Sequence, residues 1–191
     1  MSPLLPVALA RRRVLEFGCG LGGNLISMSR RFDVGLGVDI NPGFVGIARR
    51  LARRENAQNV SFEVCGPYGP TDTARFNFIF SIGVFERLPT EVVRQCLSSL
   101  TRLMLPECAM ATYFLTPSAR GTAFTSLLGD GAYNYWSPED VSSLAASCGL
   151  RIANAADWSS SFDDSPGQPG TSFARLYVLT KGCPGNEASS G

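Results

Sequence analysis

The sequence predicts a doubly wound α/β fold, in which a mixed seven-stranded sheet carries helices on both of its faces. Short apolar segments typical of strands alternate with helical segments over most of the chain, and this alternation indicates a mostly parallel sheet. The last two strand-like segments are joined by residues 158–172, which lack helical spacing. Because a short connection favours antiparallel pairing, we expect one antiparallel strand near an edge of the sheet.

The first half of the chain supplies four of the expected strands. Asn41 followed by Pro42 marks a helix start, since asparagine is a favoured N-cap and proline fits the first helical position. The segment FNFIFSI is almost entirely apolar, as in a strand buried on both faces. The expected elements are the strand Val14–Phe17, the turn Gly18–Gly23, the helix Asn24–Phe32, the strand Val34–Ile40, a helix from Pro42 to about Glu55, the strand Val60–Val64, the loop Gly66–Ala74 and the strand Phe76–Ile82.

The second half supplies three more strands. Ser137 and Pro138 mark another helix start for the same reasons. The expected elements are a helix from Pro89 to about Leu105, the strand Ala109–Leu115, the long loop Thr116–Trp136, a helix ending at Gly149, and the strands Leu150–Asp157 and Phe173–Thr180. We therefore expect residues 1–181 to form one domain and residues 182–191, which are rich in Gly, Pro and Ser, to form a disordered tail.

The composition fits one globular domain and excludes several kinds of chemistry. Of 191 residues, 45% are hydrophobic, and the balance of 17 Lys+Arg against 16 Asp+Glu gives no electrostatic case for a nucleic-acid or membrane surface. The sequence has no histidine, and none of its six cysteines forms a C-x-x-C pair, so we expect neither a zinc site nor a histidine base. No run reaches the ~18 apolar residues of a membrane helix. We expect buried free thiols and a cytoplasmic protein.

The segment VLEFGCGLGGN contains the glycine turn after the first strand, which is where doubly wound sheets bind ligands. Gly18, Gly20 and Gly23 fit the dinucleotide pattern G-x-G-x-x-G. That interpretation places a pyrophosphate near the carboxylate of Glu16, and like charges in a partly desolvated site repel each other strongly. A ligand with a cationic end suits Glu16 better. S-adenosylmethionine, which has an amino-acid end, a sulfonium centre and a nucleoside, is such a ligand.

The same segment resembles motif I of the class I S-adenosylmethionine-dependent methyltransferases, an acid-x-Gly-x-Gly-x-Gly pattern that Glu16 begins. GVDINPGFVGIAR resembles the second element of this Rossmann-like family, in which an acid at the position of Asp39 accepts both ribose hydroxyls. FNFIFSIGVFERLP and WSPEDVSSLAASCGLRI resemble its fourth strand and its late helix and strand, so the resemblance covers about residues 12–181. It implies S-adenosylmethionine as the cofactor, bound by Glu16, Gly18, Cys19, Gly20, Gly22, Asn24, Asp39, Ile40, Cys65, Gly66, Ser81 and Phe85.

The chain departs from the family pattern at several positions. Gly66 stands where relatives commonly have an acid near the adenine amino group, and Arg87 stands where many have a histidine that often faces the substrate. Asn77 replaces an aspartate at the start of the fourth strand, away from the site. Only about a dozen residues precede the first strand, where the family usually has one or two helices. A non-catalytic relative that acts as a binding or scaffold protein therefore remains an alternative, and an NAD-dependent oxidoreductase remains a weaker one.

Methyl transfer from a sulfonium is an in-line displacement that needs alignment and a dry pocket more than a fixed catalytic dyad. The segment Ser81–Val84 lacks both the [DNS]-P-P-[FY] segment of nucleobase methyltransferases and the aspartate of metal-dependent catechol-type enzymes, so we expect a small-molecule acceptor. We expect no metal ion, and the oligomeric state stays open. Where the acceptor must lose a proton, the candidate bases are Glu86, Asp130, Tyr113, Tyr133 and Tyr135. The candidate catalytic residues are Glu86, Arg87 and Tyr135.

Several of these residues also fit simpler roles. Asp39 fits a carboxylate at a helix start, Glu86 fits a surface acid equally well, and Phe85 fits the core or the cofactor wall. Tyr135 fits an aromatic anchor that packs the long loop Thr116–Trp136. That loop has three glycines and follows the fifth strand, so it is where we expect a lid, if the protein has one.

Overall fold

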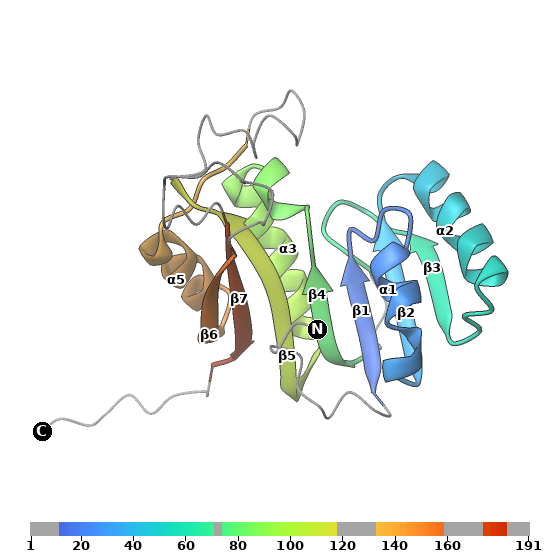
Figure 1. The fold of residues 1–191 in the computed structure, drawn as a ribbon. Helices are drawn as coiled ribbons and strands as arrows, with labels where there is room; N and C mark the ends of the chain where they lie inside the picture. The colour runs from blue at the N-terminus through green and yellow to red at the C-terminus, as the bar shows by residue number, and fades with distance from the viewer. Residues whose placement is uncertain (1–11, 71–73, 118–132, 159–173, 183–191) are drawn as a thin grey trace, which may run out of the picture.

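The computed structural model describes residues 12–70, 74–117, 133–158 and 174–182, and their seven strands form one sheet in the order β3-β2-β1-β4-β5-β7-β6 (Figure 1). All neighbours from β3 to β5 are parallel, whereas β7 is antiparallel to both β5 and β6. The strands are β1 Arg13–Phe17, β2 Val34–Asp39, β3 Val60–Val64, β4 Phe76–Ser81, β5 Met104–Leu115, β6 Leu150–Trp158 and β7 Ala174–Lys181. The predicted mixed sheet, with one antiparallel strand next to its edge, is confirmed.

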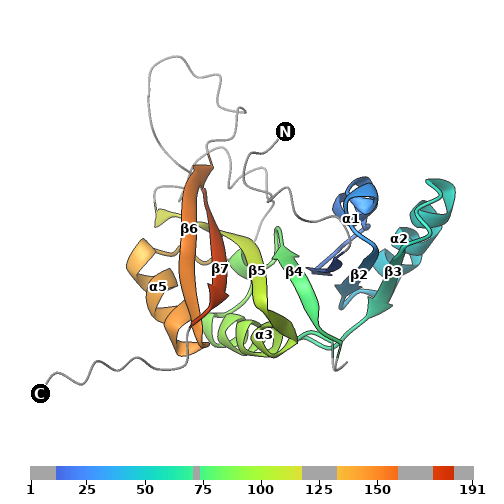
Figure 2. The same cartoon turned by 90° about the horizontal axis from the view of Figure 1, so that it is seen from below.

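Helices cover both faces of the sheet, as the alternating pattern predicts. The helices are α1 Gly23–Ser27, α2 Pro42–Arg54, α3 Thr90–Leu103 and α5 Pro138–Ser147. Figure 2 shows α3 and α5 together on one side of the sheet and α1 on the other. Two buried clusters match this arrangement: Val14 packs with residues of α1 and α2, while its neighbour Leu15 packs with residues of α3 and α5. Successive residues of β1 thus face opposite cores, as the pleat of a strand requires.

Side-chain caps fix the starts of two helices where the sequence predicts them. The Asn41 side-chain oxygen accepts hydrogen bonds from the amides of Gly43 and Phe44, at 2.9 and 3.3 Å. Ser137 and Asp140 form a reciprocal capping box at the start of α5. These caps satisfy backbone N–H groups that have no partner within the helix, and so they determine the residue at which each helix begins.

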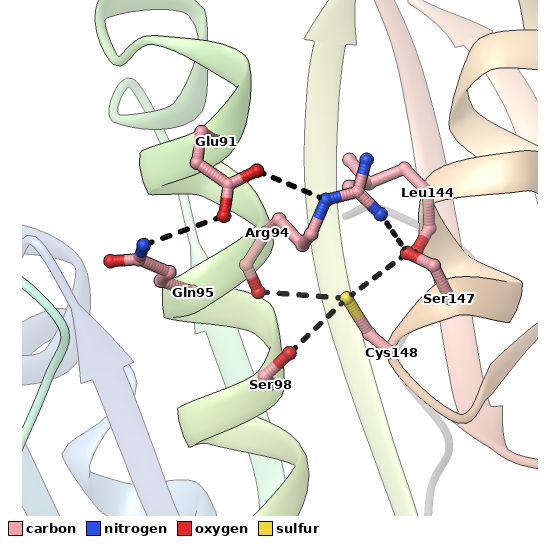
Figure 3. A network of polar contacts seen from close by, with 7 residues as sticks. All are labelled: Glu91, Arg94, Gln95, Ser98, Leu144, Ser147 and Cys148. Carbon is pink, nitrogen blue, oxygen red and sulfur yellow. Dashed lines mark hydrogen bonds and ion pairs between the residues drawn. The ribbon is translucent and has the colours of Figure 1, made fainter.

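A polar network joins α3 to α5 (Figure 3). Arg94 pairs with Glu91 at 3.4 Å and donates a hydrogen bond to the hydroxyl of Ser147 on α5. The thiol of Cys148 accepts from the hydroxyl of Ser98 at 3.5 Å and lies 3.6 Å from the carbonyl of Arg94. This thiol is free, as are those of the other cysteines among the described residues, Cys19, Cys65, Cys96 and Cys108. The network links the two helices that follow β4 and β5.

The largest differences between predicted and observed boundaries occur at two places. The helix expected over Asn24–Phe32 ends at Ser27 and gives way to a 3₁₀ turn at Ser29–Arg31. Asn59, just before β3, donates to the carbonyls of Ser29 and Phe32, both at 2.8 Å, which holds this segment in its tighter turn.

The strand expected over Ala109–Leu115 begins earlier, at Met104, so α3 ends at Leu103 rather than near Leu105. A bulge allows this extension. Phe76 pairs with Met104 and Phe78 pairs with Ala109, so β5 contains extra residues at this point.

Candidate active site

The carboxyl ends of β3, β2, β1 and β4 lie side by side on one edge of the sheet and surround a cavity of about 560 Å³. Each strand contributes the residues at or just after its end, because ligand sites of doubly wound sheets form outside the carboxyl ends of the strands. The lining residues are Glu16, Phe17, Gly18, Cys19, Gly20, Asn24, Asp39, Ile40, Phe44, Cys65, Gly66, Pro67, Ile82, Gly83, Val84, Arg87 and Leu88.

The glycine turn folds back over the ends of β1 and β2. The amides of Gly18 and Cys19 both donate to the carbonyl of Val38, at 2.8 and 2.9 Å. The amide of Gly20 donates to a carboxylate oxygen of Asp39 at 2.8 Å. These bonds connect the turn after β1 to the end of β2, so the two acidic strand ends are held in a fixed relation.

The backbone shows which glycine pattern the turn follows. Gly18, Gly20 and Gly22 all have positive φ angles, whereas Gly23 does not. A Cβ atom at Gly22 would lie 2.6 Å from the ring of Phe62, but a Cβ atom at Gly23 would meet nothing within 4 Å. The turn therefore requires glycine at the three positions of the acid-x-Gly-x-Gly-x-Gly pattern. The last glycine of the dinucleotide pattern is not required.

Glu16 is a buried carboxylate at the end of β1. Its side chain is 1% exposed, and one oxygen accepts a hydrogen bond from the side-chain amide of Asn24 at 3.0 Å. The other oxygen has no hydrogen-bond partner among the described residues. Burial raises the pKa of Glu16 to about 7, and the nearby carboxylate of Asp39 contributes to the rise. The site thus holds an acid that ionises near neutral pH.

Asp39 ends β2 with both of its carboxylate oxygens engaged by the backbone. One oxygen accepts from the amide of Gly20, and the other accepts from the amide of Asn41 at 2.9 Å. Each carboxylate oxygen can accept a second bond. The two amides therefore orient the carboxylate toward the cavity without exhausting its capacity to accept.

Two thiols in the cavity wall are unreactive at neutral pH. Burial raises the pKa of Cys19 to about 12 and that of Cys65 to about 11, so both remain protonated thiols at neutral pH. A protonated thiol is a poor nucleophile and a poor metal ligand. No group of three or more metal-ligating side chains occurs among the residues that the structure describes.

The wall after β4 carries a cationic residue, Arg87. Arg87 ends a 3₁₀ turn, Phe85–Arg87, and its guanidinium lies over the ring of Tyr133 at 5.3 Å. Its Nε atom is 4.0 Å from Oε1 of Glu86. Glu86 is fully buried and accepts a hydrogen bond from the hydroxyl of Tyr113 at 3.2 Å. Burial raises the pKa of Glu86, so its ionised form is disfavoured.

The segment that returns from β5 packs against this turn. The amide of Asn134 donates to the carbonyl of Glu86 at 2.8 Å, and its side chain donates to the carbonyl of Leu88. Tyr135 forms a β-bridge with Leu115. Asp130 and most of the loop in which a lid is expected lie outside the described residues.

Most of the residues that the sequence singles out meet in this cavity, but several lie behind it. Gly22 packs against Phe62 and Ala48, while Phe85 is buried between the rings of Phe17 and Phe114. The lining also does not include Ser81, Glu86 or Tyr135. Sequence reasoning missed Phe44, whose ring is 44% exposed in the first turn of α2. An aromatic residue at an exposed position five residues after the strand-ending acid is the signal that identifies it.

An open, doubly wound sheet with a glycine turn after its first strand and an acid at the end of its second is the architecture of nucleotide-cofactor-binding α/β proteins. Residues 14–107 match a family model described as a methyltransferase domain. This match agrees with the predicted resemblance to the class I S-adenosylmethionine-dependent methyltransferases.

Several solved structures with the same fold have names that describe methyltransferases or their complexes. Magnesium protoporphyrin IX methyltransferase of Synechocystis PCC 6803, solved with S-adenosylhomocysteine, has a TM-score of 0.70 and 18% identity over 91% of this chain and 76% of its own. A Haloferax volcanii complex of a methyltransferase activator with a methyltransferase has a TM-score of 0.74 and 16% identity, over 93% and 86%. The mitomycin 7-O-methyltransferase has a TM-score of 0.70 and 16% identity, over 90% and 49%.

Proposed function

We propose that this chain transfers the methyl group of S-adenosylmethionine to a small-molecule acceptor. The observation that carries the proposal is the pair of acids, Glu16 and Asp39, held on either side of one glycine turn and both lining one cavity. A cofactor with a cationic amino-acid end and a ribose matches two acids in this arrangement, whereas a pyrophosphate does not.

Each acid receives a separate role in this proposal. Glu16, with one oxygen bonded by Asn24, accepts the ammonium group of the cofactor through its other oxygen. Asp39, which the backbone holds in place, accepts the two ribose hydroxyls. Ile40 and Cys65–Pro67, which line the cavity beyond Asp39, bind the adenine.

The reaction is a displacement at the methyl carbon. A lone pair of the acceptor forms the new bond as the carbon–sulfur bond breaks, and the electron pair of that bond remains on sulfur, giving the neutral thioether S-adenosylhomocysteine. The contribution of the protein is to align the two reactants and to exclude water. The sequence has no histidine, so an acceptor that must lose a proton releases it to a carboxylate, a tyrosine or water.

The small-molecule acceptor is supported by a protein of the same fold. The Synechocystis neighbour is named for a porphyrin, which is a small molecule. The Haloferax neighbour was solved with an activator protein, so a protein partner is an open question for this chain as well. Among the described residues, no helix is long and apolar enough to cross a membrane.

Calorimetry tests the proposal directly. We expect S-adenosylhomocysteine to bind with a micromolar dissociation constant and NAD not to bind under the same conditions. Binding of NAD without binding of S-adenosylhomocysteine would overturn the assignment of the cavity. Binding of S-adenosylhomocysteine without methyl transfer to any member of a panel of phenols, amines and carboxylic acids would favour a non-catalytic binding protein, the alternative that the missing acid at Gly66 supports.

A further inference from the structure

We propose that the outer edge of β3, with the groove between β3 and α2, binds an extended acidic segment of a partner protein, which adds one strand to the sheet. This groove shares no lining residue with the candidate active site, so the proposal goes beyond methyl transfer and does not rest on it. The strand order places β3 at one end of the sheet, and no other strand in the described ranges pairs with its outer side (Figure 1). The groove beside it has a volume of about 470 Å³.

The backbone of β3 turns alternate hydrogen-bonding groups toward its open side. Just before the strand, the carbonyl of Asn59 accepts from β2 at 2.8 Å, and just after it, the amide of Cys65 donates to β2 at 3.0 Å. Because the backbone of a strand turns successive residues to opposite sides, the groups of Phe62 and Val64 face away from β2. The side chain of Val64 is also 50% exposed. An open edge of this kind is the template that a strand from another chain extends.

The groove beside this edge is positively charged. Arg49 and Arg53 line it from α2, and its lining residues in the described part of the chain include neither Asp nor Glu. The Nε atom of Arg49 donates to the carbonyl of Phe62 at 2.8 Å, which fixes the guanidinium at the strand edge. Glu55, at the end of α2, pairs with Arg54 at 2.9 Å. Like charges one helical turn apart repel each other, so an acidic ligand between the two arginines of the groove would relieve that repulsion.

The spacing of the two arginines matches that of a strand. Because α2 runs beside β3 in the opposite direction (Figure 1), Arg49 and Arg53 follow each other along the groove, about 6 Å apart. Side chains two positions apart on one face of a strand are about 7 Å apart. Acids at alternate positions of an added strand would therefore place one carboxylate at each guanidinium. Glu63 of β3 would not oppose them, because the pleat puts its side chain on the face opposite to Phe62 and α2.

The test uses fluorescence polarisation with three labelled peptides of seven residues. The first carries glutamate at its third and fifth positions and threonine or valine elsewhere. The second has the same composition with its glutamates at adjacent positions, so that they point to opposite faces of a strand. The third is the first peptide with N-methyl groups on its three central amides, which keep the charges but remove the donors that strand pairing needs.

Each peptide is titrated with the wild type, Arg53→Glu and the control Arg50→Glu. Arg50 is exposed on α2 and does not line the groove, so its reversal changes the net charge equally. Arg49 is left intact because its bond to Phe62 also holds the strand edge. Circular dichroism melts verify that all three proteins are folded.

We expect the wild type and Arg50→Glu to bind the first peptide alike. Arg53→Glu should bind it at least about tenfold more weakly, because an attraction becomes a repulsion and the new carboxylate can pair with Arg49 one helical turn away. The second peptide should bind the wild type several-fold more weakly than the first, and the third should show no measurable binding. Added salt should weaken binding of the first peptide, since the charges are exposed.

Each part of the proposal can fail separately. No binding of the first peptide to the wild type, or equal losses in Arg53→Glu and Arg50→Glu, would overturn the groove as the binding site. Equal affinity for the first and third peptides would overturn the added strand, because the arginines would then bind charge alone. Sedimentation velocity tests the other occupant: a stable dimer of the wild type that excludes the peptide would assign the edge to a second copy of this chain.

Discussion

The proposed role of Glu16 in cofactor binding opposes its effect on stability. Its pKa rises from an ordinary value of 4.5 to about 7 in the folded protein, so the folded state holds its proton more tightly than the unfolded state does. Stability from this group is therefore present below pH 4.5 and is lost as the pH rises toward 7. Integrated over this interval, the loss is about 3 kcal/mol.

Replacing this acid by its neutral isostere should reverse that loss. We expect Glu16→Gln to raise the free energy of unfolding of the ligand-free protein by about 2–3 kcal/mol at pH 8 and to change it little at pH 4. The glutamine oxygen can still accept the bond from Asn24. Urea unfolding at the two pH values measures the difference. An equal difference at both pH values would show that Glu16 does not titrate between them.

The same residue should make cofactor binding depend on pH. An ammonium group binds the ionised carboxylate, so S-adenosylhomocysteine affinity in the wild type should fall about tenfold for each pH unit below about 7. Glu16→Gln should bind more weakly at pH 8 and should show a flat profile between pH 5.5 and 8. Calorimetry over this range in buffers of different ionisation enthalpy would also detect the released proton. A flat profile in the wild type would contradict the ammonium assignment.

Asp39 combines two roles, one of which only the structure reveals. If it accepts both ribose hydroxyls, Asp39→Ala loses bonds worth roughly 1.5–3 kcal/mol each, and affinity should fall by about ten-fold to a few thousand-fold. Its bonds to the amides of Gly20 and Asn41 also hold the glycine turn, so the melting temperature should fall as well. Asp39→Asn should be milder, since an amide oxygen still accepts.

The matched control is Asp33→Ala, an exposed acid just before β2 that should leave both quantities unchanged. Calorimetry and circular dichroism melts on the three variants separate the lost contact from the loosened turn. Wild-type affinity in Asp39→Ala would remove the ribose assignment.

At the scale of the element, substitutions at Gly22 and Gly23 test the conformation of the glycine turn. Gly22→Ala should destabilise the protein by several kcal/mol, because the new Cβ would lie 2.6 Å from Phe62 and 2.9 Å from Ala48 at a φ of 80°. Gly23→Ala should be neutral or stabilising by up to about 1 kcal/mol, since this residue begins α1 and has open space around it. Urea unfolding of both variants measures the contrast. Comparable losses would mean that the turn follows the dinucleotide pattern instead.

Local chemistry explains which elements the sequence predicts well. Asn41 and Ser137 each carry the side chain that caps their own helix, so both helix starts are encoded within a few residues. The end of α1 depends on Asn59, more than thirty residues later, which binds the carbonyls of the following turn. The early start of β5 depends on its pairing with Phe76 across the sheet. Tertiary contacts of this kind leave no periodic signal in the segment that they reshape.

At the scale of the whole molecule, the sheet topology determines where the cavity lies. The direction of each side chain determines whether that residue lines the cavity. Once the strands are parallel, Glu16, Asp39 and Cys65 must lie along one edge, and the sequence predicts that much. Ser81 and Phe85 follow from the same logic, yet Phe85 packs between aromatic rings and neither residue lines the cavity. The direction of a side chain beyond a strand end depends on turns whose geometry the sequence pattern does not specify.

Because one cavity is lined by four strand ends, cofactor binding should stabilise the whole sheet rather than one loop. A ligand that binds only the folded state raises the free energy of unfolding by about 2.7 kcal/mol at a hundred times its dissociation constant. For a domain of this size, that corresponds to an increase of about 5–10 °C in the melting temperature. We expect S-adenosylhomocysteine to produce this increase in the wild type and NAD to produce none. At the same ligand concentration, Asp39→Ala should show a smaller increase, because its dissociation constant is larger. Differential scanning calorimetry measures these three changes in melting temperature. An increase with NAD equal to that with S-adenosylhomocysteine would mean that the cavity does not distinguish a sulfur-centred cofactor from a pyrophosphate.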